Sequence, residues 1–492
     1  MTDSINVREL VLDMLLAVTR ENKPSHVVHS QMLEKYQYLE KQERKFLSRL
    51  FKGTLERMLT LDYVIGQFST VKVSRIKPVL KNILRLSVYQ MLYMSQIPDS
   101  AACNEAVKLA GRRGFKNLKG FVNGVLRNVS RNKEKISWPD GKEQPIAYLS
   151  VMYSAPEWLV RLWVEAYGFD TARAMLEDSL ADKPVTVRCM DEDNVPAVKK
   201  VLEAEGVTVA PGSLLPYALQ LSGFNYMNEL ESFRSGLYTV QDESSMMVVE
   251  MAGLHAGDTV IDVCAAPGGK SCHAAGRLAA LEKKAADNDR DAAGCCAMPA
   301  AAAAEGEPAQ GCPGAPGGCR AGNVLKAAAG HVFARDLTPQ KAELIEENCR
   351  RLGLDNVTVQ VWDACVPNPE DEGRAQVVLA DLPCSGLGVI GRKADIKYRM
   401  SPEQMAQLAA LQRQILSVVQ NYVAPGGTLV YSTCTVNPAE NMDNARWFEK
   451  NFDFTMDNAR QFLPGVDGCD GFFIAKFVRG HGNNKVKDVS HE

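Results

Sequence analysis

Two cysteines stand where a nucleophile could act. Cys384 lies in the segment DLPCSG and Cys434 in the segment STCT, and each segment follows a stretch with the pattern of a buried strand. A cysteine thiolate is a strong nucleophile that can form a covalent bond with a substrate. Cysteines inside strand or helix patterns, such as Cys189, Cys272 and Cys349, are better interpreted as small buried apolar side chains. Cys384 and Cys434 are therefore the candidate working thiols.

The residues after Cys434 favour its thiolate. Asn437, Pro438 and Glu440 have the types of an N-cap, a first-turn proline and an N3 acid, so they predict that a helix begins there. The positive end of a helix dipole lowers the pKa of a nearby thiol. We expect Cys434 to ionise more easily than an ordinary cysteine.

Aspartates occupy the matching positions of neighbouring predicted strands. Asp262, Asp336, Asp363 and Asp381 each lie at or next to the carboxyl end of a strand, as Cys434 does. Doubly wound parallel sheets bind their ligands along that edge. One acid at the end of a strand is often only a turn former, but four of them beside a cysteine predict a binding and catalytic site.

The first of these strands runs into a glycine-containing turn that could hold a nucleoside. The turn matches neither the GxGxxG pattern nor the phosphate-binding GxxxxGK[ST] pattern. Its two glycines lack the Cβ atoms that would block a ligand at a helix start. Asp336, after the next strand, could accept hydrogen bonds from ribose hydroxyls. The turn consists of Cys264, Ala265, Ala266, Pro267, Gly268, Gly269 and Lys270.

The pattern of apolar residues predicts three domains that must position these groups. Helical spacing throughout predicts an all-α domain over residues 1–140. Residues 141–240 predict a small α+β module, with a helical lead-in over 150–180 and short strands from 184 onward. From residue 241 to 480, strands alternate with amphipathic helices, which is typical of a doubly wound, mostly parallel α/β sheet. Residues 481–492 form a polar tail.

A low-complexity segment interrupts the third domain. Residues 285–330 contain 16 Ala, 8 Gly and 4 Pro with no apolar period, so we expect an insertion over 282–330 that buries no core and is dispensable for chemistry. Zinc binding by its cysteines is conceivable, but their spacing lacks the usual C-x₂₋₄-C pairs, and we expect no metal. These cysteines are Cys295, Cys296, Cys312 and Cys319.

Charge is divided unevenly along the chain. The net charge is −3, yet residues 1–140 hold 24 basic and 13 acidic residues, a net of +11. The remaining residues, 141–492, hold 32 basic and 46 acidic residues, a net of −14. Within residues 71–140 there are 14 bases and 4 acids. Such a cluster is often only a solvated helix face, but the deficit of acids favours RNA docking. The candidate RNA-binding residues are Arg112, Arg113, Lys116 and Lys119.

The chain has the composition of a cytoplasmic protein. Its N-terminus lacks the apolar core of a signal peptide, and no apolar run is long enough to span a membrane. Thirteen cysteines, an odd number, do not suit a fully paired secreted protein. We expect reduced thiols, no membrane partner and a monomer.

Five motifs together resemble the RNA cytosine-5 methyltransferases, whose cofactor is S-adenosylmethionine. They are VQDESS, AAPGGK, DLPCSG, STCTVNPAEN and DGFFIAKF, within residues 145–480. The first domain resembles the antitermination factor NusB, and the second an RRM-like RNA-binding module. A fusion of this kind is similar to the bacterial Sun/Fmu-type enzymes, which methylate a cytosine of 16S ribosomal RNA. The departures are the insertion and Leu382, where the family commonly has Ala.

The resemblance implies a role for each site residue. The turn from Cys264 to Lys270 would line the cofactor, Asp336 would hold its ribose and Asp363 would lie by its adenine. Asp381 would lie between cofactor and base and bond to N3 of the cytosine. Cys434 would add to carbon 6 so that carbon 5 can accept the methyl group, and Cys384 would assist release of the adduct. The target base must leave its stack, which suits unassembled or partly assembled RNA.

Three alternatives remain open at this point. The chain could form 5-methylcytosine in another RNA, such as tRNA. It could methylate an exocyclic amine, a reaction that needs no cysteine nucleophile. It could also be a non-enzymatic NusB-like RNA-binding factor, although that would leave both strand-end cysteines unexplained.

Overall fold

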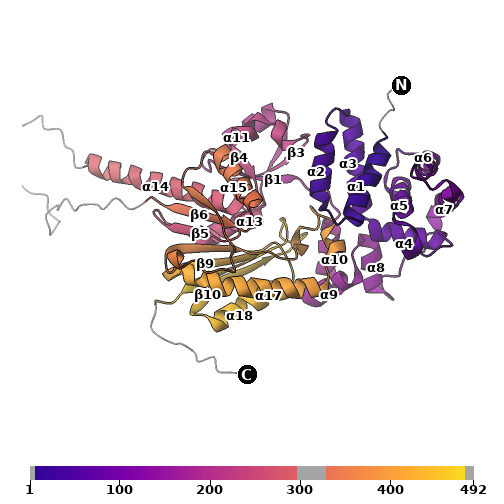
Figure 1. The fold of residues 1–492 in the computed structure, drawn as a ribbon. Coiled ribbons are helices and arrows are strands. Elements are labelled where there is room, and N and C mark those ends of the chain that lie inside the picture. The colour runs from indigo at the N-terminus through magenta and orange to yellow at the C-terminus, as the bar shows by residue number, and fades with distance from the viewer. Residues whose placement is uncertain (1–5, 296–328, 482–492) are drawn as a thin grey trace, which may run out of the picture.

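The computed structural model describes residues 6–295 and 329–481. The first domain is all-helical, as predicted, and is built around α5 (Pro78–Tyr93), which is buried on nearly every side. A helix that is apolar on all sides belongs at the centre of a bundle. The helices packed against it are α1 (Val7–Thr19), α3 (Lys41–Glu56), α4 (Met58–Phe68), α6 (Asp99–Arg112) and α7 (Lys119–Asn132), and α2 (Ser25–Lys35) packs against α1 (Figure 1).

Three helices follow and pack against the last domain. The sequence predicts them as a lead-in to the small module, but their apolar residues share one core with Leu387, Ile390 and Val436 of the last domain. This core therefore lies beside the segments that carry Cys384 and Cys434. The helices are α8 (Pro145–Tyr153), α9 (Glu157–Tyr167) and α10 (Phe169–Asp178).

The small module is a four-stranded antiparallel sheet with the strand order β2-β3-β1-β4. Three of its strands were predicted, but β2 was not. Its four residues are mostly exposed and end in Pro211, which suits an edge strand and gives little alternation to detect. The elements are β1 (Val185–Cys189), α11 (Val195–Ala204), β2 (Thr208–Pro211), β3 (Ala218–Ser222), α12 (Glu231–Arg234) and β4 (Tyr238–Val240).

The last domain is a seven-stranded sheet with the order β10-β11-β9-β8-β5-β6-β7. Pairing is parallel from β9 through β7, and β10 and β11 add an antiparallel edge, so the predicted doubly wound, mostly parallel sheet is confirmed. The strands are β5 (Thr259–Asp262), β6 (His331–Asp336), β7 (Val357–Val361), β8 (Ala375–Asp381), β9 (Val423–Thr433), β10 (Phe454–Phe462) and β11 (Phe472–Arg479).

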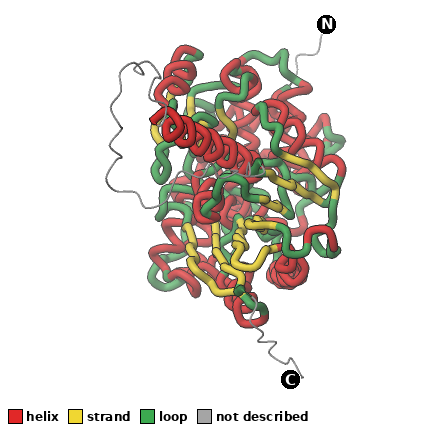
Figure 2. Tube along the Cα trace, turned by 90° about the vertical axis from the view of Figure 1, so that its left-hand side faces the viewer, coloured by secondary structure: helices red, strands yellow, loops and turns green. Residues whose placement is uncertain are grey.

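Helices cover both faces of this sheet (Figures 1 and 2). Successive residues of β8 point to opposite faces: Val377 and Leu379 join one core, whereas Val378 and Ala380 join the other. The helices on the first face are α13 (Glu243–Ala252), α14 (Gly269–Cys295) and α15 (Pro339–Leu352), and those on the second are α17 (Pro402–Val419) and α18 (Met442–Asn451).

The helix before the predicted insertion is longer than the sequence indicates. Helix α14 continues to Cys295, well past the point where the apolar period stops. The stretch from Glu282 is rich in Ala, Lys and Asp, and alanine and lysine have high helix propensity, so the helix can continue without an apolar face. Three of the four cysteines of the low-complexity segment, Cys296, Cys312 and Cys319, lie outside the described residues, so the prediction about zinc is not tested there. No described helix is both long and apolar enough to cross a membrane.

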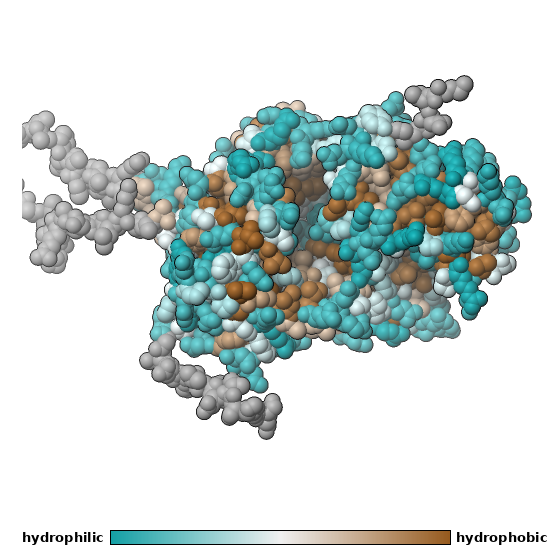
Figure 3. Space-filling model, viewed as in Figure 1, coloured by the Kyte–Doolittle hydropathy of each residue, from teal (hydrophilic) through white to brown (hydrophobic). Residues whose placement is uncertain are grey.

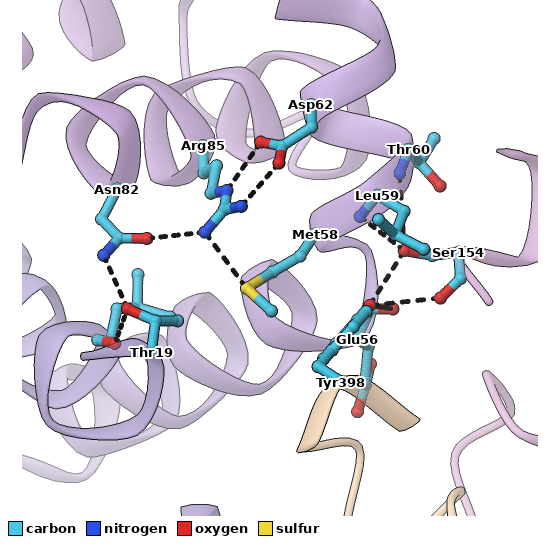
Figure 4. A network of polar contacts seen from close by, with 11 residues as sticks. Thr19, Glu56, Met58, Leu59, Thr60, Asp62, Asn82, Arg85, Ser154 and Tyr398 are labelled. Carbon is cyan, nitrogen blue, oxygen red and sulfur yellow. Dashed lines mark hydrogen bonds and ion pairs between the residues drawn. The ribbon is translucent and has the colours of Figure 1, made fainter. Parts of the chain in front are cut away.

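A buried polar seam joins the helical domain to the loop that follows Cys384 (Figure 4). The short helix α16 (Ile396–Arg399) presents Lys397 and Tyr398 to the end of α3, where the Glu56 carbonyl lies 2.8 Å from Lys397 Nζ and 3.0 Å from the Tyr398 hydroxyl. The Tyr398 hydroxyl also lies 3.0 Å from Ser154 Oγ, which accepts a hydrogen bond from the Leu59 amide. Segments far apart in sequence thus satisfy one another's polar groups.

The seam continues into the helical domain through a buried arginine. Arg85 is held by Asp62 at 2.7 and 2.6 Å and by Asn82 at 3.1 Å. Beside the seam, a cavity of about 300 Å³ separates the helical domain from the start of the small module, and Figure 3 shows the surface hollowed between these parts. The helical domain therefore contacts the segment after Cys384 at the seam and is separated from the small module by this cavity.

Lys397 makes the stability of the seam depend on pH. Burial lowers the pKa of Lys397 to about 7, whereas a lysine in the unfolded chain titrates near ~10.4. Between these values the unfolded chain binds more protons than the folded one, so stability should rise with pH. We expect the melting temperature of the wild type, relative to that of Lys397→Met, to increase from about pH 7 to about pH 10. A difference that is constant across this range in calorimetry would contradict the assignment.

Candidate active site

A cavity of about 290 Å³ opens at the carboxyl ends of β5, β6, β7, β8 and β9. Four of the predicted strand-end groups, Asp336, Asp363, Asp381 and Cys434, line it together with Cys384, so the sheet brings the two candidate thiols and these acids together as expected. The other lining residues are Val263, Cys264, Ala266, Leu337, Lys341, Trp362, Ala364, Cys365, Leu382, Pro383, Leu411 and Ile415.

Asp336 is oriented by the turn that was predicted to hold a nucleoside. Its carboxylate accepts hydrogen bonds from the Ala266 amide at 2.9 Å and the Leu337 amide at 2.7 Å, and it pairs with Lys341 at 2.8 Å. A carboxylate has about four acceptor positions, so this one keeps the capacity to accept from a hydroxyl. The Asp363 carboxylate accepts from the Cys365 amide at 2.9 Å on the same wall.

The two glycines of the turn serve the fold more directly than the ligand. Gly268 has a φ of +105°, and a Cβ there would meet Ile345 and Cys272 rather than the cavity. Neither Gly268 nor Gly269 lines the cavity, and the Ala265 side chain is buried in a core with Ile345. The positive φ therefore explains Gly268, and Cys264 and Ala266 are the residues of the turn that face the cavity.

Lys270 lies in the first turn of α14, and its amine contacts Asp381. Its Nζ lies 2.6 Å from Asp381 Oδ2, while Ser432 donates a hydrogen bond to Oδ1 at 3.0 Å. Asp262 lies fully buried beneath this pair and accepts a hydrogen bond from Ser271 at 2.6 Å. Burial raises the pKa of Asp262 to about 7. Asp262 thus holds the start of α14 through Ser271 and does not line the cavity.

Cys384 and Cys434 face each other with their sulfur atoms 3.3 Å apart. The hydrogen bond from the Cys384 thiol lowers the pKa of Cys434 against the opposing effect of burial, and Lys270 lowers it further. The same hydrogen bond, together with burial, raises the pKa of Cys384 well above its ordinary value. The contact therefore favours the thiolate form of Cys434 and the protonated form of Cys384.

The predicted cause of the low pKa of Cys434 is wrong. The residues after Cys434 form a single 3₁₀ turn at Pro438–Glu440, and the backbone leaves the helical region at Asn441 before α18 begins at Met442. A helix dipole acts mainly within the first turn, and no α-helix begins at the predicted place. The neighbouring thiol, not a helix end, favours ionisation.

Glu440 is a site residue that sequence reasoning missed. It was interpreted as an ordinary N3 acid, but its fully buried carboxylate accepts hydrogen bonds from the Ser385 amide at 2.8 Å and the Ser385 hydroxyl at 2.5 Å. Asn437 and Gln412 also donate to it, at 2.9 and 3.2 Å. Glu440 thereby ties the loop of Cys384 to the loop of Cys434. Its place six residues after Cys434 was the only available signal, and helix capping explained that equally well.

The predicted RNA-binding residues lie in the helical domain, at the corner between α6 and α7 (Figure 1). Arg113 pairs with Glu9 at 3.0 Å and with Asp13 at 2.7 Å, and Arg112 lies 3.5 Å from Glu9. These acids belong to α1, so counting charges over residues 71–140 could not find them. Lys116 is exposed, and no ion pair of Lys116 or Lys119 is found within the described ranges.

Among the described residues, one cluster has the residue types of a metal site. Glu192, Glu250 and the buried His273 bring their ligand atoms within 4.8 Å of one another. Arg277, however, bonds to both carboxylates, at 2.9 Å in the case of Glu250, and so already neutralises them. We interpret this cluster as an ion-pair network between the small module and the sheet domain.

Comparison with known proteins agrees with the domain order. Residues 5–131 match the model of the NusB family, 155–227 match the ferredoxin-like domain of RsmF/B-like methyltransferases, and 305–478 match "16S rRNA methyltransferase RsmB/F". The predicted resemblance and fold class are confirmed.

Curated relatives match along nearly the whole chain. A "probable ribosomal RNA small subunit methyltransferase B" of Bacillus subtilis is 34% identical, covering 95% of this chain and 98% of its own length. A protein of the same description from Synechocystis is 29% identical and covers 96% of this chain and 100% of its own length.

Solved structures are similar in fold. A crystal structure of PH0851 has a TM-score of 0.73 at 22% identity and covers 96% of this chain and 99% of its own. A structure of NSun6 from Pyrococcus horikoshii with SFG has a TM-score of 0.51 at 18% identity. It covers 67% of this chain and 99% of its own chain.

The thiol pair predicts how readily Cys434 is alkylated. We expect iodoacetamide to modify Cys434 with a pH midpoint below that of Cys365, a neighbour on the cavity wall whose pKa is raised by burial. Replacing Cys384 by Ala removes the S–H donor, so the midpoint of Cys434 should move to higher pH. Peptide mass spectrometry across a pH series measures both. An unchanged midpoint in Cys384→Ala would show that the thiol contact does not control ionisation.

Proposed function

The chain belongs to the 16S rRNA methyltransferase RsmB/F family, and from that premise we propose that it methylates carbon 5 of a cytosine in 16S ribosomal RNA. Membership of this family means that the protein is an S-adenosylmethionine-dependent RNA methyltransferase. The choice of carbon 5 rests on one observation above all. Two cysteines whose sulfur atoms lie 3.3 Å apart line the cavity at the strand ends, and transfer to an exocyclic amine needs neither.

The residues around the cavity fit S-adenosylmethionine. Asp336 keeps acceptor capacity for ribose hydroxyls, Asp363 lies on the adjoining wall, and Leu337 and Ile415 add apolar surface of the kind a nucleobase packs against. Cys264 and Ala266 would complete the site from the turn after β5. When bound, this cofactor supplies an electrophilic methyl group.

Cys434 would begin the reaction. Carbon 5 of cytosine is a poor nucleophile, so the Cys434 thiolate adds to carbon 6 and turns the ring into an enamine that can attack the methyl group. N3 must gain a proton, here from water, as the ring saturates. Asp381, held by the Lys270 ammonium at 2.6 Å, lines the cavity, where its carboxylate would accept a hydrogen bond from the protonated N3. The Asp381 and Lys270 pair thus serves as the polar partner of the ring.

Cys384 would assist the last step. After the methyl group has been transferred, water would take the carbon-5 proton, and the electron pair of that C–H bond would expel the Cys434 sulfur from carbon 6. Because its pKa is raised, Cys384 keeps its proton and can donate a hydrogen bond to the departing Cys434 sulfur. Glu440 would hold Cys384 in that position through Ser385.

RNA would approach over the basic helical domain. Neutralising phosphate charge releases counterions, so cations that contact RNA make binding depend steeply on salt. Lys116 and Lys119 are available for such contacts, whereas Arg113 would have to exchange Glu9 and Asp13 for phosphate. The small ferredoxin-like module would contribute a second RNA contact. Formation of 5-methylcytosine in another RNA, such as tRNA, is the alternative that shares this site.

Removing Cys434 and removing Cys384 should impair different steps of the reaction. We expect Cys434→Ala to abolish both turnover and the covalent RNA adduct, and Cys384→Ala to accumulate an adduct that survives denaturant, because release is impaired. Gel shift under denaturing conditions and bisulfite mapping of 16S RNA measure the two effects. Cys103→Ala, a buried cysteine of the helical domain, serves as the control for general destabilisation. Full activity of Cys434→Ala would refute the covalent mechanism.

The basic corner should control the salt dependence of RNA binding. Neutralising Arg112, Arg113 and Lys116 together should weaken binding and flatten the slope of log Kd against log salt concentration. A control in which exposed cations of the sheet domain are neutralised, at Lys283, Lys284 and Lys450, should leave the slope unchanged. If the first variant keeps the wild-type slope, RNA does not dock on this corner.

A further inference from the structure

The contact between Cys384 and Cys434 is close enough for chemistry between the two thiols themselves. Their sulfur atoms lie 3.3 Å apart on the wall of an open cavity. We propose that this pair is an oxidation site, at which a peroxide converts the two thiols to an intramolecular disulfide that blocks the enzyme reversibly. The loss of activity rests on the proposed function, but formation of the disulfide does not.

The backbone around the pair allows the bond to form. A disulfide has a sulfur separation of about 2.05 Å, so the two atoms must approach by only about 1.3 Å. Cys384 and Cys434 both lie just beyond the paired ends of β8 and β9, where Asp381 lies opposite Ser432. Neither cysteine is a paired residue of the ladder, so the movement need not break it.

The chemistry balances with a peroxide as the oxidant. The Cys434 thiolate attacks the O–O bond, so an S–O bond forms, the O–O bond breaks, and the departing hydroxide takes up a proton to leave as water. The Cys384 sulfur then attacks the sulfenic sulfur of Cys434. The S–S bond forms as the S–O bond breaks, and the leaving hydroxide takes the Cys384 proton to form a second water. Two thiols and one hydrogen peroxide thus give one disulfide and two waters.

Among the cysteines that line the cavity, Cys434 and Cys384 should be oxidised before the others. Cys264 and Cys365 also line it, but burial raises the pKa of both, so neither is a thiolate at neutral pH. Peroxides react with thiolates rather than thiols. Cys434, which has a lowered pKa and a thiol beside it, combines the reacting sulfur with the resolving one.

A second close pair provides an internal comparison. Cys272 and Cys349 lie 3.7 Å apart between α14 and α15, but they are only 0% and 7% exposed and do not line the cavity. Their contact is nearly as short, yet a peroxide in solution has no route to them along the cavity. Access, rather than sulfur separation alone, should therefore decide which pair is oxidised.

The test treats the full-length protein with hydrogen peroxide, blocks free thiols in denaturant with N-ethylmaleimide, and maps the peptides by mass spectrometry. We expect the peptides of Cys384 and Cys434 to become linked first, with Cys272 and Cys349 still alkylated. Methyl transfer to 16S RNA should fall in proportion to the linked fraction and return with dithiothreitol. Cys349→Ala should form the same link at the same rate, because it changes only the comparison pair.

The variant Cys384→Ala separates a disulfide from simple oxidation of Cys434. Without the second thiol, Cys434 should proceed to sulfinic acid, which dithiothreitol does not reduce. If wild-type Cys434 also becomes sulfinic acid with no linked peptide, or if the Cys272 and Cys349 pair is linked first, the proposal is wrong. If the link forms completely and methyl transfer continues, the disulfide stands, and it is the proposed catalytic role of Cys434 that fails.

Discussion

The parallel pairing of β8 with β9 is the constraint on which the site depends. Asp381 lies opposite Ser432 in this ladder, so the loops that leave the two strands start side by side. Cys384 and Cys434, 50 residues apart in the chain, therefore meet at 3.3 Å. A shift of one residue in this register would turn one loop's side chains to the opposite face of the sheet and separate the sulfurs.

Buried polar groups hold the two loops once the strands have placed them. Glu440 lies under the loops and takes four hydrogen bonds, two of them from Ser385. A buried carboxylate is costly unless such donors satisfy it, so it favours only the arrangement in which both loops are in place. Further along the same segment, Lys397 and Tyr398 bind the end of α3. The loop of Cys384 is thus held at one end by its own domain and at the other by the helical domain.

Much of this site could be predicted from sequence because its groups follow strands. A buried strand and the acid or cysteine after it are local signals, and the edge at which parallel strands end brings such signals together. Contacts between distant segments were not predictable in this way. Glu440 resembled a helix cap, and the acids that pair with Arg113 lie about a hundred residues earlier in α1. The helical continuation of α14 was missed because propensity, not an apolar face, maintains it.

The seam at α16 also bears on the order in which the protein is made. Ribosomes deliver the chain from its N-terminus, so the end of α3 and Ser154 are synthesised more than two hundred residues before Tyr398, which bonds to both. The end of α3 is therefore synthesised, as a possible docking surface, well before the segment that follows Cys384. The helical domain would then act as an intramolecular template for the segment after Cys384. Without that domain Lys397 would lose the Glu56 carbonyl, whereas Tyr398 would keep its contact with Ser154.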